Sequence, residues 1–294
     1  MMYARRLTLV ASSLLVTIAA RSISAQRDTT SPTAIAMREG ARLDLAGSTS
    51  RARAIFQQLI DSAATPAAKA AARRAMAMSY AFDGDCANTV KYEAMVIDYW
   101  TTREQAEPQN AFYQEGEMAN EAARVCIDAG QLGTAEQWYR KGYALGTKEP
   151  APQTHPRSLW DFRLAHALGR LAARRGDTAV AHRQIAAARQ ALDGDTAMAA
   201  HQERFFPYLV GYVALYTNDL ETAATQLQKA VALEGNERDP FMHCLLAMTR
   251  ERMGRRAEAL ELYRQAYNMA TGHNPPAAFV RPFVRTKLEA AAAG

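Results

Sequence analysis

The chain has 294 residues, of which 49% are hydrophobic and 22% are charged, with 11 prolines and only three cysteines. This composition excludes a disordered chain, a collagen-like fibre and a small fold held together by disulfides. The formal net charge is +5, but Arg5, Arg6 and Arg21 lie in the first 25 residues without an acidic neighbour, so the remainder is close to neutral. Because no dense basic stripe or known DNA-binding motif is present, the sequence indicates no nucleic-acid binding.

Residues 1–25 have the pattern of an export signal. A basic start through Arg6 precedes an apolar stretch over residues 7–20, and small residues lead to the polar Gln26. The apolar stretch is shorter than the roughly 20 residues that cross a bilayer. We therefore expect cleavage after Ala25 and a periplasmic or secreted protein without stable membrane insertion, the alternative being a retained anchor. Residues 26–32 are expected to form a flexible lead.

From residue 33 onward the chain is rich in alanine and shows no sustained period-2 alternation, which predicts an all-α fold. Six segments follow one pattern: a helix, a turn with glycine and a small or acidic residue, and a second helix with alanine near its start, replaced once by threonine, and a bulky residue four positions later. These pairs are Ala52 and Phe56, Thr89 and Glu93, Ala135 and Tyr139, Ala181 and Ile185, Ala223 and Leu227, and Ala259 and Tyr263. The second pair is the weakest match.

This pattern resembles the tetratricopeptide repeat (TPR) family over residues 33–271. The resemblance implies a right-handed superhelical solenoid of about six helical hairpins, in which stacked neighbours bury each other's apolar faces. The expected segments are 33–66, 67–103, 110–150, 157–194, 201–237 and 239–271. Equivalent second-helix positions are 37, 46, 46, 42 and 36 residues apart, against about 34 in the family, so the middle repeats are extended. An irregular helical bundle is the alternative.

Residues 272–294 are expected to form a C-terminal capping helix and tail. The Pro275-Pro276 pair breaks the sixth segment, and the helix that follows is predicted to be interrupted near Pro282. Phe279 and Phe283, four residues apart, would lie on its buried face.

Cys86 lies at the start of the second helix of segment two, and Cys126 lies near the end of the first helix of segment three. In an up-down-up stack both lie at the same edge, so they are a candidate disulfide, with two buried thiols as the alternative and Cys244 left free. Asp-Gly-Asp runs at residues 83–85 and 193–195 are expected to be turns in which glycine is left-handed and the second aspartate caps the next helix.

Motifs of catalysis and metal binding are missing from the sequence. We find no glycine-rich phosphate loop, no serine nucleophile elbow and no histidine pair at metal-ligand spacing. We therefore expect no enzymatic activity, no metal site and no cofactor.

The TPR resemblance implies a concave groove lined by first-helix residues. The residues it places there are Arg74, Asn120, Arg124, Arg163, Arg170, Arg174, Phe205, Tyr208, Tyr212, Tyr216 and Phe241, with Met78, His166, Met248 and Arg252 on the same faces. Arginine and aromatic side chains favour a protein or peptide partner with acidic segments. In the alternative interpretation the tyrosines pack between helices and the arginines are solvated.

Taken with the export signal, this predicts an exported TPR scaffold that binds protein or peptide partners without catalysis. Two alternatives stay open: a structural envelope protein that associates with itself, and an envelope hydrolase with a site built on helical repeats.

Overall fold

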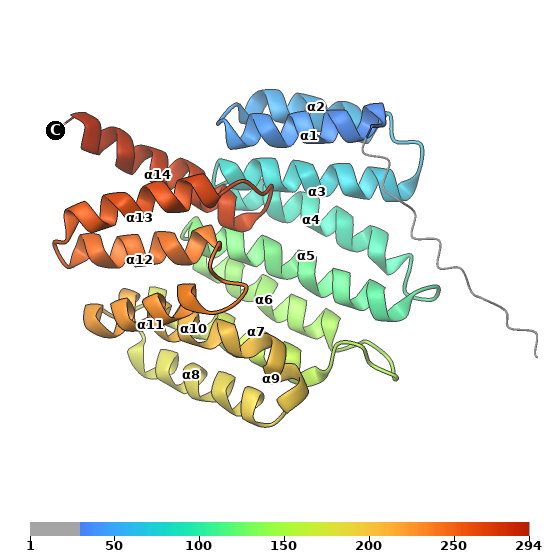
Figure 1. Cartoon of the computed structure of the whole chain (residues 1–294). Helices are drawn as coiled ribbons and strands as arrows, with labels where there is room; N and C mark the ends of the chain where they lie inside the picture. The colour runs from blue at the N-terminus through green and yellow to red at the C-terminus, as the bar shows by residue number, and fades with distance from the viewer. Residues whose placement is uncertain (1–29, 294) are drawn as a thin grey trace, which may run out of the picture.

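The computed structural model describes residues 30–293, which form fourteen α-helices, one short 3-10 helix and no strand (Figure 1). The predicted all-α class is therefore confirmed. The predicted export signal and most of the expected lead lie outside the described residues. Between residues 30 and 293, no helix combines the length and the apolar character needed to cross a membrane.

The helices are arranged as six consecutive hairpins followed by a last helix, and Figure 1 shows neighbouring hairpins packed side by side. The hairpins are α1 (Pro32–Leu45) with α2 (Thr49–Asp61), α3 (Pro66–Phe82) with α4 (Cys86–Thr101), α5 (Pro108–Asp128) with α6 (Leu132–Gly146), α7 (Arg157–Arg174) with α8 (Thr178–Asp193), α10 (Phe206–Tyr216) with α11 (Leu220–Ala232), and α12 (Pro240–Arg252) with α13 (Arg256–Met269), and α14 (Pro275–Ala293) follows. A short helix α9 (Thr196–Gln202) and a 3-10 turn (Glu203–Phe205) precede α10.

The turn between the two helices of each hairpin repeats in detail. One residue in each turn has a left-handed backbone, and these residues are Gly47, Gly84, Gly130, Gly176, Asn218 and Gly254. Each lies five positions before the small residue of the second helix, and those six small residues are at most 2% exposed. The turn and the close helix contact therefore recur with the same irregular spacing that the sequence shows.

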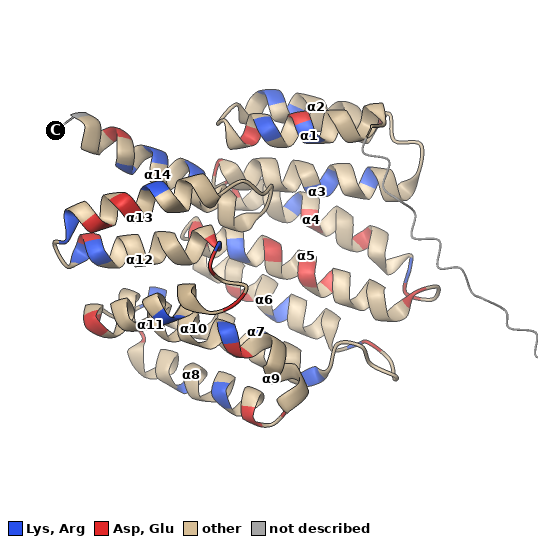
Figure 2. Cartoon of the chain, in the orientation of Figure 1, with Lys and Arg blue, Asp and Glu red and all other residues tan. Residues whose placement is uncertain are grey.

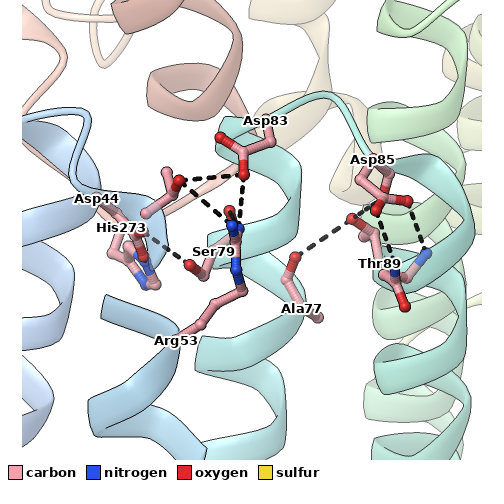
Figure 3. A network of polar contacts seen from close by, with 10 residues as sticks. Asp44, Arg53, Ala77, Ser79, Asp83, Asp85, Thr89 and His273 are labelled. Atoms are coloured by element: carbon pink, nitrogen blue, oxygen red, sulfur yellow. Dashed lines mark hydrogen bonds and ion pairs between the residues drawn. The ribbon is translucent and has the colours of Figure 1, made fainter. Parts of the chain in front are cut away.

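Thr89 takes the place of alanine in the second hairpin and is fully buried. Its hydroxyl donates to the backbone carbonyls of Asp85, at 2.8 Å, and of Ala77, at 3.2 Å (Figure 3). Because the hydroxyl has partners, it does not carry the cost of a buried polar group left without a hydrogen bond.

Two local predictions were wrong. Gly194 has φ −78°, in the right-handed region, because it ends α8 in helical geometry, although Asp195 still caps α9 by accepting from the Met198 amide at 3.0 Å. Pro282 does not interrupt the last helix, since α14 runs continuously from Pro275 to Ala293. Pro282 points outward, while Val280 and Val284 are buried and hold the helix in place.

Helix α14 closes the array rather than only covering its last hairpin. It packs against α12 and α13, and also against α1, α3 and α5 from the beginning of the chain. In the loop before it, His273 Nε2 lies 2.7 Å from Oδ2 of the buried Asp44, whose Oδ1 accepts from the Ser79 hydroxyl at 2.8 Å (Figure 3). The His273 ring also stacks on Phe82, with ring centroids 5.6 Å apart. The C-terminal segment thus joins the last hairpin to the first two.

A disulfide joins Cys86 at the start of α4 to Cys126 in α5, the pair singled out in the sequence. Cys244 is free and buried within α12. Burial raises the pKa of the Cys244 thiol well above its usual range, so this group is not a reactive thiolate.

Candidate binding site

Neighbouring first helices each carry a stripe of polar and aromatic side chains. Residues three or four apart on a helix share a face, so each stripe points to one side. The stripes are Glu117, Asn120 and Arg124 on α5, Arg163, His166, Arg170 and Arg174 on α7, and Phe205, Tyr208, Tyr212 and Tyr216 at and along α10. Since α7 packs against α10, two of these stripes lie side by side.

The stripes meet at a cavity of about 330 Å³. Its lining residues are Glu117, Asn120, Arg124, Tyr139, Phe162, Arg163, His166, Arg170, Gln202, Phe205 and Tyr208. Of the residues proposed from the sequence, the structure brings together Asn120, Arg124, Arg163, His166, Arg170, Phe205 and Tyr208 in this one wall.

Arg170 is buried at the base of this group of side chains. Its Nη1 donates to the Tyr208 hydroxyl at 3.2 Å, its Nη2 donates to the Tyr139 hydroxyl at 3.0 Å, and its Nε donates to the His166 carbonyl at 3.4 Å. Arg170 forms no ion pair with any residue that the structure describes, although Asp128 acts on it at longer range. Two phenol oxygens therefore satisfy a buried guanidinium without neutralising its charge.

Arg124 and Arg163 differ in how their charges are balanced. Arg163 pairs with Glu117 across α5 and α7, and its guanidinium also lies over the Trp160 ring at 5.1 Å. Arg124 lies 4.7 Å over the ring of Phe241, and its Nε has no hydrogen-bond partner in the described chain. Of the charged side chains that line the cavity, three are arginines and one is a carboxylate, so the wall is cationic.

Two titratable groups near these arginines are His166, which is neutral, and Asp128, whose carboxyl group is still largely ionised at pH 7 and offsets part of the positive charge. Burial, and secondarily the charge of Arg170, lowers the pKa of His166 well below its usual range, so the ring is neutral at pH 7. Burial raises the pKa of Asp128 to about 6, while Arg124 and Arg170 act in the opposite direction. The positive charge of the cavity therefore comes from its arginines and not from histidine.

The other residues proposed from the sequence lie elsewhere. Arg74 pairs with Glu121 and lines a separate cavity of about 820 Å³. Arg174 lies beside Tyr212, with Nη1 3.4 Å from its hydroxyl, and 4.9 Å over the ring of Tyr216.

Tyr212 and Phe241 are corrections to the sequence-based expectation, because both are only 1% exposed and belong to the core instead of an open surface. Tyr212 packs among Tyr208 and Tyr216, and Phe279 of α14 covers Phe241 with ring centroids 5.1 Å apart. Neither ring is accessible to a partner in this structure.

Several lining residues were not expected from the sequence. Glu117 lies three residues before Asn120 and seven before Arg124, so the helical period of α5 alone identifies it. Tyr139 was expected only as the bulky residue of the third pair, and no sequence signal shows that its hydroxyl reaches Arg170. Gln202 closes the short helix α9, which the sequence did not predict as a separate element.

Between residues 30 and 293, no group of three or more His, Cys, Asp and Glu side chains is placed to hold a metal ion. No family model matches the chain, and no significant match is found among curated proteins. The guanidinium and phenol groups of the wall are of the kind that bind carboxylates, and its aromatic faces supply apolar contact area.

Proposed function

We propose that the protein is an exported, non-catalytic TPR-type scaffold, a right-handed solenoid that binds protein or peptide partners through the face formed by its first helices. One observation carries the proposal: arginine and aromatic side chains from successive hairpins converge on a single cavity, the one lined by Arg124, Arg163, Arg170, Phe205 and Tyr208. The left-handed turn that recurs in each hairpin supports the repeat architecture.

The chemistry of the cavity favours an acidic segment of the partner. Arginine and tyrosine are enriched at the energetic centres of protein interfaces, where they combine charge, hydrogen bonding and contact area. Elsewhere basic and acidic positions are interspersed along the helices (Figure 2). The cationic cavity is thus a local feature in a chain of mixed charge, and mixed charge elsewhere limits non-specific attraction.

Peptide selection on the mature protein tests the proposal. Peptides enriched from a random display library should carry Asp or Glu beside an apolar residue, and Arg163→Gln should weaken their binding by about tenfold. The matched control is Arg140→Gln, which removes an exposed arginine from the second helix α6 and should leave the affinity unchanged.

Circular dichroism of both variants should match that of the wild type. Failure to enrich any peptide, or equal binding by Arg163→Gln, would argue against partner binding at this face.

A further inference from the structure

The cavity between α5, α7 and α10 has more cationic than anionic groups and is bordered by unsatisfied atoms. Arg124 Nε and His166 Nε2 are both buried, and neither has a hydrogen-bond partner among the described residues. Buried polar atoms in folded proteins are nearly always paired, so two unpaired atoms beside one cavity call for an explanation. An anionic ligand provides one for Arg124 Nε, which is a donor, whereas the neutral His166 ring offers a hydrogen at Nε2 in one of its two tautomers only.

Two phenol groups add donors to the same wall. The hydroxyl oxygens of Tyr139 and Tyr208 accept from Arg170, which leaves the hydrogen of each phenol available for another acceptor. Arg124 contributes further N–H groups without a competing carboxylate within ion-pair distance. These groups suit an oxyanion, and a carboxylate matches the flat geometry of a guanidinium.

The remaining wall is aromatic and compact. Phe162, Phe205 and the Tyr208 ring line the cavity, whose volume of about 330 Å³ is at the lower end for small-molecule sites. Tyr212 and Phe241, on α10 and α12, are buried and add no open surface to this wall. The cavity therefore has room for one compact group, which is either a small molecule or a single side chain of a longer partner.

We propose that this pocket binds a small aromatic carboxylic acid as a free molecule. The carboxylate lies against Arg124 and the Tyr208 hydroxyl, and the ring packs against Phe162 and Phe205. This small-molecule site goes beyond the partner binding proposed above. Partner binding requires a cationic face on the first helices, but it does not require that a small molecule binds there.

Isothermal titration calorimetry with benzoate on the mature protein tests this inference. Benzoate should bind saturably with one molecule per chain. Benzyl alcohol keeps the ring without the charge, and acetate keeps the charge without the ring, so each should bind at least about tenfold more weakly. Added salt should weaken benzoate binding.

Substitutions in the cavity wall test whether benzoate binds in this cavity. Arg124→Gln should weaken benzoate binding by about tenfold or more, and Tyr208→Phe should weaken it while keeping the ring that packs in the wall. Arg140→Gln is the matched control, since this arginine is exposed on the second helix α6, and this variant should bind benzoate as tightly as the wild type does. Thermal unfolding checks that each variant is folded, and Tyr208→Phe keeps the test decisive if Arg124→Gln is unstable.

Three outcomes would overturn the inference: no benzoate binding at millimolar concentration, equal binding by Arg124→Gln and Tyr208→Phe, or inorganic phosphate binding as tightly as benzoate. If acidic peptides bind the protein and benzoate does not, the small-acid proposal is refuted and the partner-binding proposal stands. If benzoate binds and no peptide does, the partner-binding proposal is refuted and the small-acid proposal stands.

Discussion

Glu93 offers a sharp test of how the hairpins pack. On α4 it takes the position that Phe56 and Tyr139 take in other hairpins, and it is fully buried. Neither of its carboxyl oxygens has a hydrogen-bond partner in the described chain. Burial raises the pKa of Glu93 well above its usual range, Glu121 adds to this effect, and Arg74 opposes it. The folded state therefore favours the neutral form of this carboxyl group more than the unfolded chain does.

Glu93→Met keeps the length of the side chain and removes its polar atoms. A buried polar group without a partner costs about 1–3 kcal/mol, so we expect the variant to raise the free energy of unfolding by about that amount. The pH dependence has a definite sign. Because the folded pKa is raised, the stability contribution of the wild-type carboxyl is fully present below its unfolded pKa and is lost as the pH rises toward its folded value. The gain from Glu93→Met should thus be larger at pH 8 than at pH 5.

Urea unfolding at both pH values measures this gain. Glu289→Met is the matched control, because Glu289 is exposed on α14, and its effect should stay within about 0.5 kcal/mol. A destabilised Glu93→Met variant, or a gain that does not change with pH, would refute the reasoning.

The remaining predictions concern stability. Replacing Cys86 and Cys126 together by serine should lower the free energy of unfolding by about 2–4 kcal/mol, and alkylation of denatured, unreduced protein should modify Cys244 alone, whereas three modified cysteines would contradict the disulfide. Tyr212→Ala should cost about 3–5 kcal/mol in urea unfolding because the ring is buried, and a negligible cost would place the ring at the surface. Asp44→Ala should cost about 1–3 kcal/mol and speed proteolysis within α14, and unchanged protection of α14 would argue against the closure contact.

The helices and turns were accessible from the sequence because their causes are local. Gly84 and Gly130 mark turns that need a left-handed residue, and Ala135 and Ala181 mark close contacts between helices. The residue pattern and its spacing were therefore enough to predict these helices and turns. Gly194 was misassigned because glycine permits a left-handed backbone without requiring it.

The closure by α14 was not accessible, since the contact between His273 and Asp44 joins residues 229 positions apart. Whether the two ends of the chain meet depends on the small rotation between each hairpin and the next, added over all the hairpins. A local sequence pattern does not predict this total rotation. Tyr212 is a single residue whose tertiary contacts the local sequence likewise does not predict. An aromatic stripe at helical spacing looks the same whether it faces solvent or another helix, and only the packing of the neighbouring helices decides which.

The central claim is that partners bind at the face formed by the first helices, and site-specific photo-cross-linking tests it most directly. A photoreactive phenylalanine analogue in place of Gln202, which lines the cavity, is compared with the same analogue in place of Gln137, which is exposed on the second helix α6. After irradiation with a peptide selected on the protein, the account predicts a cross-linked product at position 202 and none at position 137. Cross-linking at position 137 alone, or equally at both positions, would contradict it.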